Sequence, residues 1–346
     1  MAAKQLKGAF FEHLVKRVLL RCGFRAVKPD GLFVFSRGRQ QFVNGKGAAH
    51  DADVLVEPPI QIPFIYPYRI IFECKAYTGK IRLPVVRNIH GLRDDLNEFE
   101  IVTKQHLSDR QNNRRSAIAV LNRSRHLYQV GLACISPLTK PALEFAINNK
   151  IPVLSFPWLL SSDVFDRLST FYDRDDDIDV HEGLAESFAS GVVQNWEQYD
   201  LGEETSTLFR DVCAEVEQHV WVGLIESGDI VFLKMSDGAV TYLNDSRELN
   251  HEGKFHYSAN NPELWRLTIG PNERVAHFRL PEAVVREWAD QDFEHSAAVH
   301  MKAGRFSRML IFTGKPERPV VTVNIDKQWL AEVAAEAEGE DIGEFQ

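Results

Sequence analysis

An acidic and a basic side chain stand two residues apart in an apolar stretch of the chain. Residues 69–77 are Arg-Ile-Ile-Phe-Glu-Cys-Lys-Ala-Tyr, and this run of β-branched and aromatic residues predicts a buried strand. Because side chains alternate across a strand, Glu73, Lys75 and Tyr77 share one face, with the first two roughly 6–7 Å apart along the backbone. Ionised side chains seldom occupy such a strand unless they are paired, bind a metal ion or take part in chemistry.

Two further acids lie on elements expected to adjoin this strand. Asp53 belongs to a predicted strand over residues 50–57, on the same face as Asp51. Glu12 lies on a predicted helix over residues 8–23, at the border of its apolar stripe, and Gly23 is expected to cap the end of this helix. Taken alone, the Glu-x-Lys pair favours an interior ion pair, and Glu12 favours a solvent-exposed position. Taken together, the four charged residues favour a site that does chemistry.

Basic residues gather in the same part of the chain. Arg37, Arg39 and Lys46 lie in the glycine-punctuated segment 36–47, which is equally typical of a loop against a phosphate backbone and of a solvated hairpin. A polar segment further on carries Arg114 and Arg115, two more candidates for phosphate contacts.

The charge of the whole chain divides in the same way. The net charge is -9, yet residues 1–160 carry about 24 Lys and Arg against about 12 Asp and Glu, so the excess acid lies in the remainder. A basic half with an acid cluster on a strand indicates a polyanionic partner such as nucleic acid. The plainer alternative is two soluble domains that differ in surface charge.

The elements between these residues predict how they are positioned. Short strands are expected at residues 33–35, 50–57 and 69–77, and a helix begins near Pro84. The order strand, helix, strand over residues 128–156 predicts a βαβ unit with parallel strands beside a hairpin-like core.

The second half has a different pattern. An acidic run over residues 173–190 is predicted to be a linker, because it lacks the glycine and terminal glutamate of a calcium-binding loop. Beyond it, a hairpin is expected around Ser227-Gly228. Further strands are expected at residues 264–269, 298–301, 309–312 and 320–325, and helices at 206–218, 281–290 and 327–335. The sequence therefore predicts a domain over residues 1–172 and a separate α+β domain over residues 191–346 that senses a signal, binds a partner or oligomerises.

The order of elements and the spacing of acids in the first half resemble the PD-(D/E)XK nuclease superfamily, and within it the Mrr-type restriction endonucleases. The resemblance covers roughly residues 6–160. Glu12 matches the acid of the first helix, Asp53 the acid of the first catalytic strand, and Glu73-Cys74-Lys75 the (D/E)XK triplet. Ala52 stands where the family name has proline, a departure that leaves the acid in place. The expected fold is α/β, a restriction-endonuclease-like mixed sheet flanked by helices.

The resemblance implies hydrolysis of phosphodiester bonds with the help of Mg²⁺ or Mn²⁺. Asp53, Glu73, the main-chain carbonyl of Cys74 and Glu12 would be the metal ligands, since these are the hard oxygen donors that such ions prefer. Lys75 would stabilise developing negative charge or orient the attacking water.

The main functional hypothesis is thus a DNA endonuclease, as in a restriction or anti-phage system. One alternative is a nuclease fold that holds nucleic acid without cutting it, as a subunit of a larger complex, and another is a nuclease acting on RNA or branched DNA. Because cutting both strands usually takes two sites, a homodimer or larger assembly is expected, with a protein partner at the acidic second half.

The composition favours the cytoplasm. No apolar run reaches the roughly 18–20 residues of a membrane span, and the first residues lack the apolar core of a signal peptide. The four cysteines, which are far apart and predict buried thiols in a reducing compartment, are Cys22, Cys74, Cys134 and Cys213.

Overall fold

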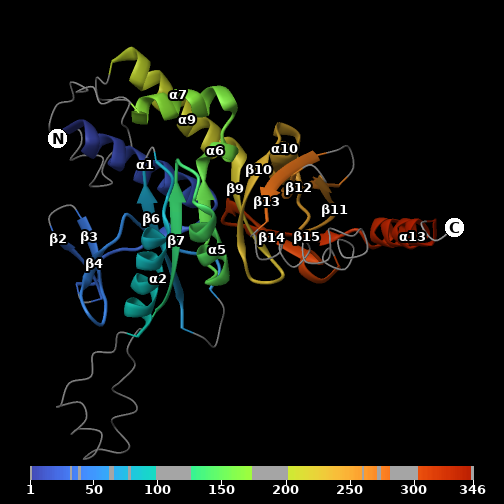
Figure 1. The fold of residues 1–346 in the computed structure, drawn as a ribbon, viewed down its shortest axis with the longest axis horizontal. Coiled ribbons are helices and arrows are strands. Elements are labelled where there is room, and N and C mark those ends of the chain that lie inside the picture. Colours follow the sequence, from blue (N-terminus) through green and yellow to red (C-terminus); the bar gives the residue numbers. More distant parts are fainter. Residues whose placement is uncertain are drawn as a thin grey trace, which may run out of the picture.

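The computed structural model of the protein describes two β-rich halves joined by helices (Figure 1). The residues it describes are 2–31, 33–37, 40–61, 66–76, 79–98, 126–173, 202–258, 261–270, 274–280 and 303–343. In spatial order, a five-stranded mixed sheet contains β1 Arg25–Ala26, β5 Val54–Glu57, β6 Tyr68–Lys75, β7 Leu127–Cys134 and β8 Val153–Ser155. The helices in these ranges are α1 Ala2–Arg21, α2 Leu83–Asn97, α5 Lys140–Asn148, α6 Phe156–Leu159, α7 Ser162–Asp173, α9 Glu203–His219, α10 Asp237–Asp245 and α13 Lys327–Gly343.

Strand β6 is the central strand of the mixed sheet, with both of its faces covered. It pairs antiparallel with β5 and parallel with β7, which in turn is parallel to β8. Ile71 faces the cluster of buried residues beneath α2 and α5, whereas Ile70 and Phe72 face α1 and the second half. The predicted buried strand, the helix near Pro84 and the βαβ unit are therefore confirmed.

Helix α1 ends as the sequence predicts, at a glycine. Gly23 has a φ of 85°. Its amide donates to the carbonyl of Leu20, and the amide of Phe24 donates to the carbonyl of Leu19. This pair of hydrogen bonds is a Schellman cap, which needs a left-handed residue at its turn. The cap fixes the end of the helix that carries Glu12.

A small antiparallel sheet precedes the mixed sheet and corrects one expectation. Its strands are β2 Val34–Arg37, β3 Gln40–Asn44 and β4 Ala49–Asp51. The single strand expected over residues 50–57 was wrong, because Asp51 ends β4 in this sheet and Val54 begins β5 in the mixed sheet. Between them the amide of Ala52 donates to the carbonyl of Gln41, which lets the chain pass from one sheet to the other.

The second half is a closed barrel of seven strands. In spatial order these are β10 Ile230–Met235, β13 Arg274–Arg279, β12 Asn261–Ile269, β11 Asn250–Ser258, β15 Arg318–Ile325, β14 Arg308–Lys315 and β9 Val220–Ile225. The hairpin predicted around Gly228 is confirmed by the antiparallel pairing of β9 with β10. The separate α+β domain is not confirmed. Three expected segments lie outside the described residues: the acidic run after Asp173, the helix at 281–290 and the strand at 298–301.

One hydrophobic cluster runs through both halves. Phe10 of α1 stacks on Phe209 of α9 with ring centroids 3.4 Å apart, and Phe72 of β6 meets Phe232 of β10 edge to face at 6.1 Å. The same cluster continues into the barrel interior, which is filled by large side chains such as Trp265. The two halves therefore share a core. Among the described helices, none is long and apolar enough to cross a membrane.

Candidate active site

Three elements bring the predicted catalytic side chains into one region. Val54 of β5 pairs with Phe72 of β6 in antiparallel register, so Asp53, one residue earlier, comes opposite Glu73. A hydrogen bond of 2.7 Å fixes Asp53, whose carboxylate accepts the amide proton of Cys74. Helix α1 packs against β6 and brings in Glu12, whose titration is influenced by the charges of Asp53, Glu73 and Lys75.

Two of the carboxyl groups are held away from their ordinary protonation behaviour. The pKa of Glu12 is raised from 4.5 to about 8, mainly by burial and then by the neighbouring charges of Asp53, Glu73 and Asp51. Burial likewise raises the pKa of Asp53 to about 7, with Glu73 as the second cause. The hydrogen bond from Cys74 and the charge of Lys75 act in the opposite direction but do not prevail. The region thus holds more negative charge than its single lysine neutralises.

Lys75 forms an ion pair with Glu73, and both side chains are about a quarter exposed. This is the interaction that the Glu-x-Lys spacing suggests when considered alone. The pair lies beside Asp53, where Glu73 raises the pKa of Asp53 more than Lys75 lowers it.

One contributor was absent from the predicted catalytic set. Asp51, at the end of β4, raises the pKa values of both Glu12 and Asp53 although it belongs to the other sheet. The available signal was its place two residues before Asp53, but the unexpected break between β4 and β5 separates the roles of the two acids.

The carboxylates are suitable ligands for a hard cation, but their side chains are not arranged to coordinate one. Glu12, Asp53 and Glu73 offer carboxylate oxygens, which Mg²⁺ and Mn²⁺ prefer. The pKa values of Glu12 and Asp53 are raised, so a positive charge nearby would stabilise their ionised forms. Within the described ranges, however, no group of three or more His, Cys, Asp or Glu side chains is arranged to hold a metal ion. Glu73 is turned to Lys75, and the structure records the amide of Cys74, rather than its carbonyl, in contact with Asp53.

Of the predicted nucleic-acid contacts, the structure describes Arg37 and Lys46. Arg37 lies on β2, where its guanidinium packs over two phenylalanine rings. Lys46 makes an exposed ion pair of 2.8 Å with Glu98. The other predicted residues, Arg39, Arg114 and Arg115, lie outside the described residues, as does Tyr77. The segment 36–47 is thus mostly a hairpin, one of its two expected forms.

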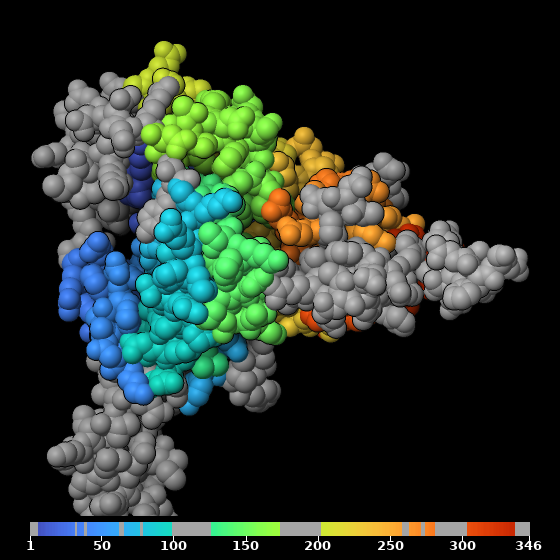
Figure 2. All heavy atoms as spheres, in the orientation of Figure 1, coloured from blue at the N-terminus to red at the C-terminus, as the bar shows by residue number. Residues whose placement is uncertain are grey.

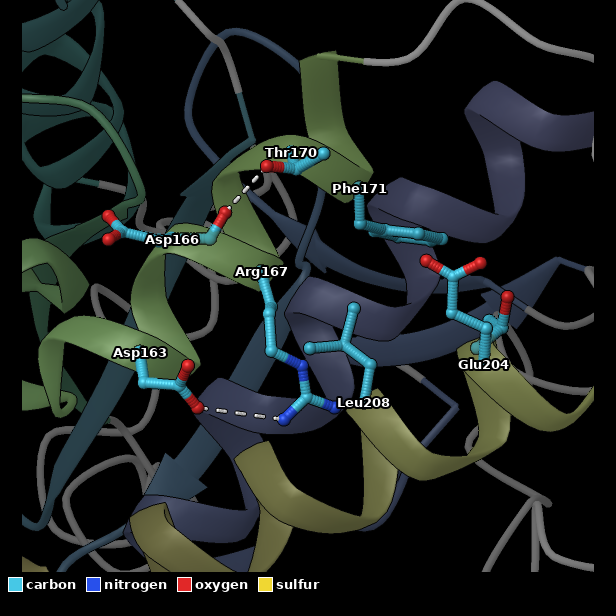
Figure 3. A pocket seen from close by; sticks show the side chains of 8 residues that line it. Asp163, Asp166, Arg167, Thr170, Phe171, Glu204 and Leu208 are labelled. Carbon is cyan, nitrogen blue, oxygen red and sulfur yellow. Dashed lines mark hydrogen bonds and ion pairs between the residues drawn. The ribbon is translucent and has the colours of Figure 1, made fainter.

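Two cavities lie apart from the acids. Figure 3 shows the one between α7 and α9, of about 220 Å³, where Arg167 pairs with Asp163. The second, of about 620 Å³, opens where the chain passes from β6 to α2 and is lined in part by Lys80, Arg82 and Thr139. Because its lining includes Lys80 and Arg82, the second cavity has the charge that suits a phosphate group.

The mixed sheet and its flanking helices are consistent with a restriction-endonuclease-like fold. Residues 3–109 match the family Mrr_cat, described as a restriction endonuclease, which is consistent with an Mrr-type, PD-(D/E)XK nuclease-like domain in the N-terminal part. The match covers less than half of the chain and leaves the barrel unassigned.

Other comparisons add little. No curated protein matches the chain. A crystal structure of a protein of unknown function, AF1548, is similar with 14% sequence identity and a TM-score of 0.32, covering 61% of this chain and 97% of that one. A likeness of that degree carries no argument about fold or function.

Proposed function

We propose that the protein is a metal-dependent endonuclease that hydrolyses phosphodiester bonds of DNA. The observation that carries the proposal is the gathering of Glu12, Asp53, Glu73 and Lys75 from α1, the segment before β5, and β6. The match of residues 3–109 to a restriction endonuclease family supports nuclease activity at the level of the family. We assign this activity to a restriction or anti-phage system, an assignment that the description of the family supports.

In this proposal the carboxylates hold the metal ion. Asp53 and Glu73 are the principal ligands, together with the main-chain carbonyl of Cys74, and Glu12 completes the site. When bound, Mg²⁺ or Mn²⁺ supplies Lewis acidity to the phosphate and lowers the pKa of a water molecule. The raised pKa values of Glu12 and Asp53 support this assignment, because a cation relieves the crowding of negative charge that raises them.

Lys75 has a second task, at the phosphate. Its ammonium stabilises the negative charge that develops on the phosphate oxygens, or orients the attacking water. Because Lys75 is paired with Glu73, that ion pair has to open before the lysine acts. Arg37, Arg39, Lys46, Arg114 and Arg115 would bind the phosphate backbone, joined by Lys80 and Arg82 at the cationic cavity.

A second candidate function is a non-cleaving subunit that binds nucleic acid. Two observations favour it: the closed pair of Lys75 with Glu73, and the lack of a three-donor group among the described residues. A nuclease acting on RNA or branched DNA is a third candidate, with the same catalytic residues.

The rest of the chain supplies the setting of the reaction. We assign the acidic second half to a protein partner or to self-association, with a homodimer or larger assembly presenting two sites to a duplex. The four cysteines are free thiols, which suits the cytoplasm.

Cleavage of supercoiled plasmid DNA tests the proposal. The wild-type chain is expected to nick or linearise the plasmid with Mg²⁺ or Mn²⁺, and Lys75→Ala and Asp53→Ala to lower the rate by at least about 100-fold. Lys150→Ala and Asp163→Ala are the matched controls, because both residues are exposed and lie away from the acid cluster. Binding without cleavage by the wild type under every metal condition would establish the second candidate, and cleavage of RNA or branched DNA alone would establish the third.

A further inference from the structure

A row of three side chains crosses the small sheet and leads to the acid cluster. Phe35 of β2 is the register partner of Phe42 of β3, and Phe42 is the partner of Asp51 of β4. Partners in antiparallel strands point to the same face of a sheet, so the two rings and the carboxylate share one face. Adjacent strands are about 4.8 Å apart, so the row places the rings within about 10 Å of Asp51 along the sheet.

The two rings do not serve either hydrophobic core. The opposite face of the sheet is the packed one, where Val34 and Val43 are fully buried. Phe35 and Phe42 belong to neither core cluster, are only partly buried, and stack on each other with centroids 5.6 Å apart. The sheet lies at one margin of the molecule, where its atoms form part of the surface (Figure 2, blue).

A planar cation completes the face. The guanidinium of Arg37 lies 5.2 Å from the centroid of each ring, and the residue itself is exposed. An arginine in this position offers both a flat surface for stacking and hydrogen-bond donors for a phosphate. Aromatic rings next to an arginine are the combination with which proteins bind unpaired nucleotides, since every base has a π-face.

The row is continuous with the acids of the active site. Asp51 ends β4 two residues before Asp53, and the amide of Ala52 between them donates to the carbonyl of Gln41, the neighbour of Phe42 on β3. A nucleic-acid strand that is bound with one phosphate at Asp53 would therefore have its neighbouring nucleotides beside Phe42 and Phe35. The rings can stack only on a base that is not already stacked in a duplex, which restricts the kind of nucleic acid that fits.

We propose that Phe35, Phe42 and Arg37 form a stacking site for an unpaired nucleobase of the substrate, next to the acids. The substrate is then a single strand, or a duplex in which a base beside the scissile phosphate is unpaired or turned out of the stack. This inference rests on the proposed nuclease function, since it names the form of nucleic acid that the same site accepts.

Binding of a short single strand that contains 2-aminopurine tests the inference, because stacking on an aromatic ring quenches the fluorescence of this base. The measurement uses the full chain carrying Lys75→Ala, without a divalent metal, so that cleavage does not enter. Phe42→Leu and Phe35→Leu keep an apolar side chain of similar size but remove the ring, and Arg37→Gln removes the planar cation. Arg87→Gln is the matched control, because Arg87 also lies over a phenylalanine, Phe145, but on α2.

We expect quenching with the single strand in the parent chain and in Arg87→Gln. In Phe42→Leu we expect weaker quenching and affinity lowered about 5- to 100-fold, with no matching loss for a blunt duplex. Unchanged single-strand affinity in Phe42→Leu, with an unchanged unfolding midpoint, would overturn the inference, as would an equal loss for the duplex. Equal cleavage of intact duplex by wild type and Phe42→Leu would refute the stacking site and support the nuclease function. Stacking of the base without cleavage of any nucleic acid would support the stacking site and refute the nuclease function.

Discussion

Glu12 and Asp53 carry the central physical argument, because each is a carboxyl group that the fold makes difficult to ionise. Their pKa values of about 8 and about 7 arise first from burial and then from mutual repulsion. A fold that only needed stability has no use for such a cluster, since two apolar side chains would cost less. Charge crowding of this kind is typical of sites that bind a cation or hold a proton for chemistry.

The raised pKa of Glu12 has a direct consequence for stability in the absence of metal. The unfolded chain releases this proton near the ordinary pKa of 4.5, whereas the folded chain keeps it up to about pH 8. The energetic penalty that Glu12 imposes on the folded state is therefore absent below about pH 4.5. It grows, and lowers the free energy of unfolding, as the pH rises toward 8. We expect Glu12→Gln to raise the free energy of unfolding by about 1–3 kcal/mol at pH 8, allowing for the partial exposure of the side chain.

Urea unfolding at pH 8 and pH 4.5, in the presence of a chelator, measures this effect. The gain in Glu12→Gln is expected to vanish at the lower pH, and Asp163→Asn, an exposed acid on α7, is expected to show no gain at either. Equal stability of Glu12→Gln and wild type at pH 8 would contradict the burial of this carboxyl group.

At the scale of elements, β6 positions the site, and its place depends on close packing over β7. Gly131 is the register partner of Phe72. A Cβ atom at this position would lie 2.5 Å from the ring of Phe72, so the glycine is required by the close approach of that ring. The ring holds β6 against the barrel through its contact with Phe232.

Gly131→Ala should therefore disturb β6, the strand that carries Glu73 and Lys75. We expect it to lower the free energy of unfolding by about 1–3 kcal/mol, the usual cost of an overpacked core. The second-site variant Phe72→Leu should restore part of the loss, because it removes the ring that clashes. Additive losses in the double variant, measured by urea unfolding, would show that the two residues do not meet.

Much of the N-terminal half was predictable from local pattern. The apolar run of β6, the glycine after α1 and the βαβ spacing are each local signals, read from one continuous stretch of sequence. The structure confirms each of them. The break between β4 and β5 was not predictable, because a period of two continues through Asp51 and Asp53 although the chain changes sheets. The closing of Lys75 onto Glu73 depends on side-chain orientation, which spacing alone does not fix.

The barrel was missed for a different reason. Its closure depends on pairing between distant segments, such as β10 with β13 and the parallel pair β11 with β15. Strands β11 and β13 have many polar residues, so their local sequence pattern predicted neither of them. Registers of this kind come from tertiary contacts, so the individual hairpin was predictable while the closed barrel was not.

At the scale of the whole molecule, the shared core contradicts a simple picture of two independent units. Arg21 at the end of α1 donates to the carbonyl of Thr313 in the barrel at 3.0 Å. Gly314, with a φ of 74°, comes so close that a Cβ atom there would overlap the carbonyl of Arg21. Helix α1 thus contributes Glu12 to the acid cluster and also contacts the barrel.

A fragment of residues 1–172 should consequently fold poorly. Removing the second half exposes Phe10 and Phe72, which lose Phe209 and Phe232 as partners. We expect the fragment to be aggregation-prone or to unfold at least about 10 °C below the full chain, measured by thermal melting. A soluble fragment with an unchanged midpoint would restore the predicted boundary as that of an independent domain.

The most direct test of the central claim is calorimetric titration of the full chain with Mn²⁺ at pH 7 in buffers of different ionisation enthalpy. Because Glu12 and Asp53 hold protons near neutral pH, binding of the ion is expected to release about one proton per site, and fewer at pH 9. Asp53→Asn is expected to weaken binding by at least about tenfold, while Asp163→Asn leaves it unchanged. Binding that releases no protons and survives Asp53→Asn, or no binding to the wild type at all, would contradict the account.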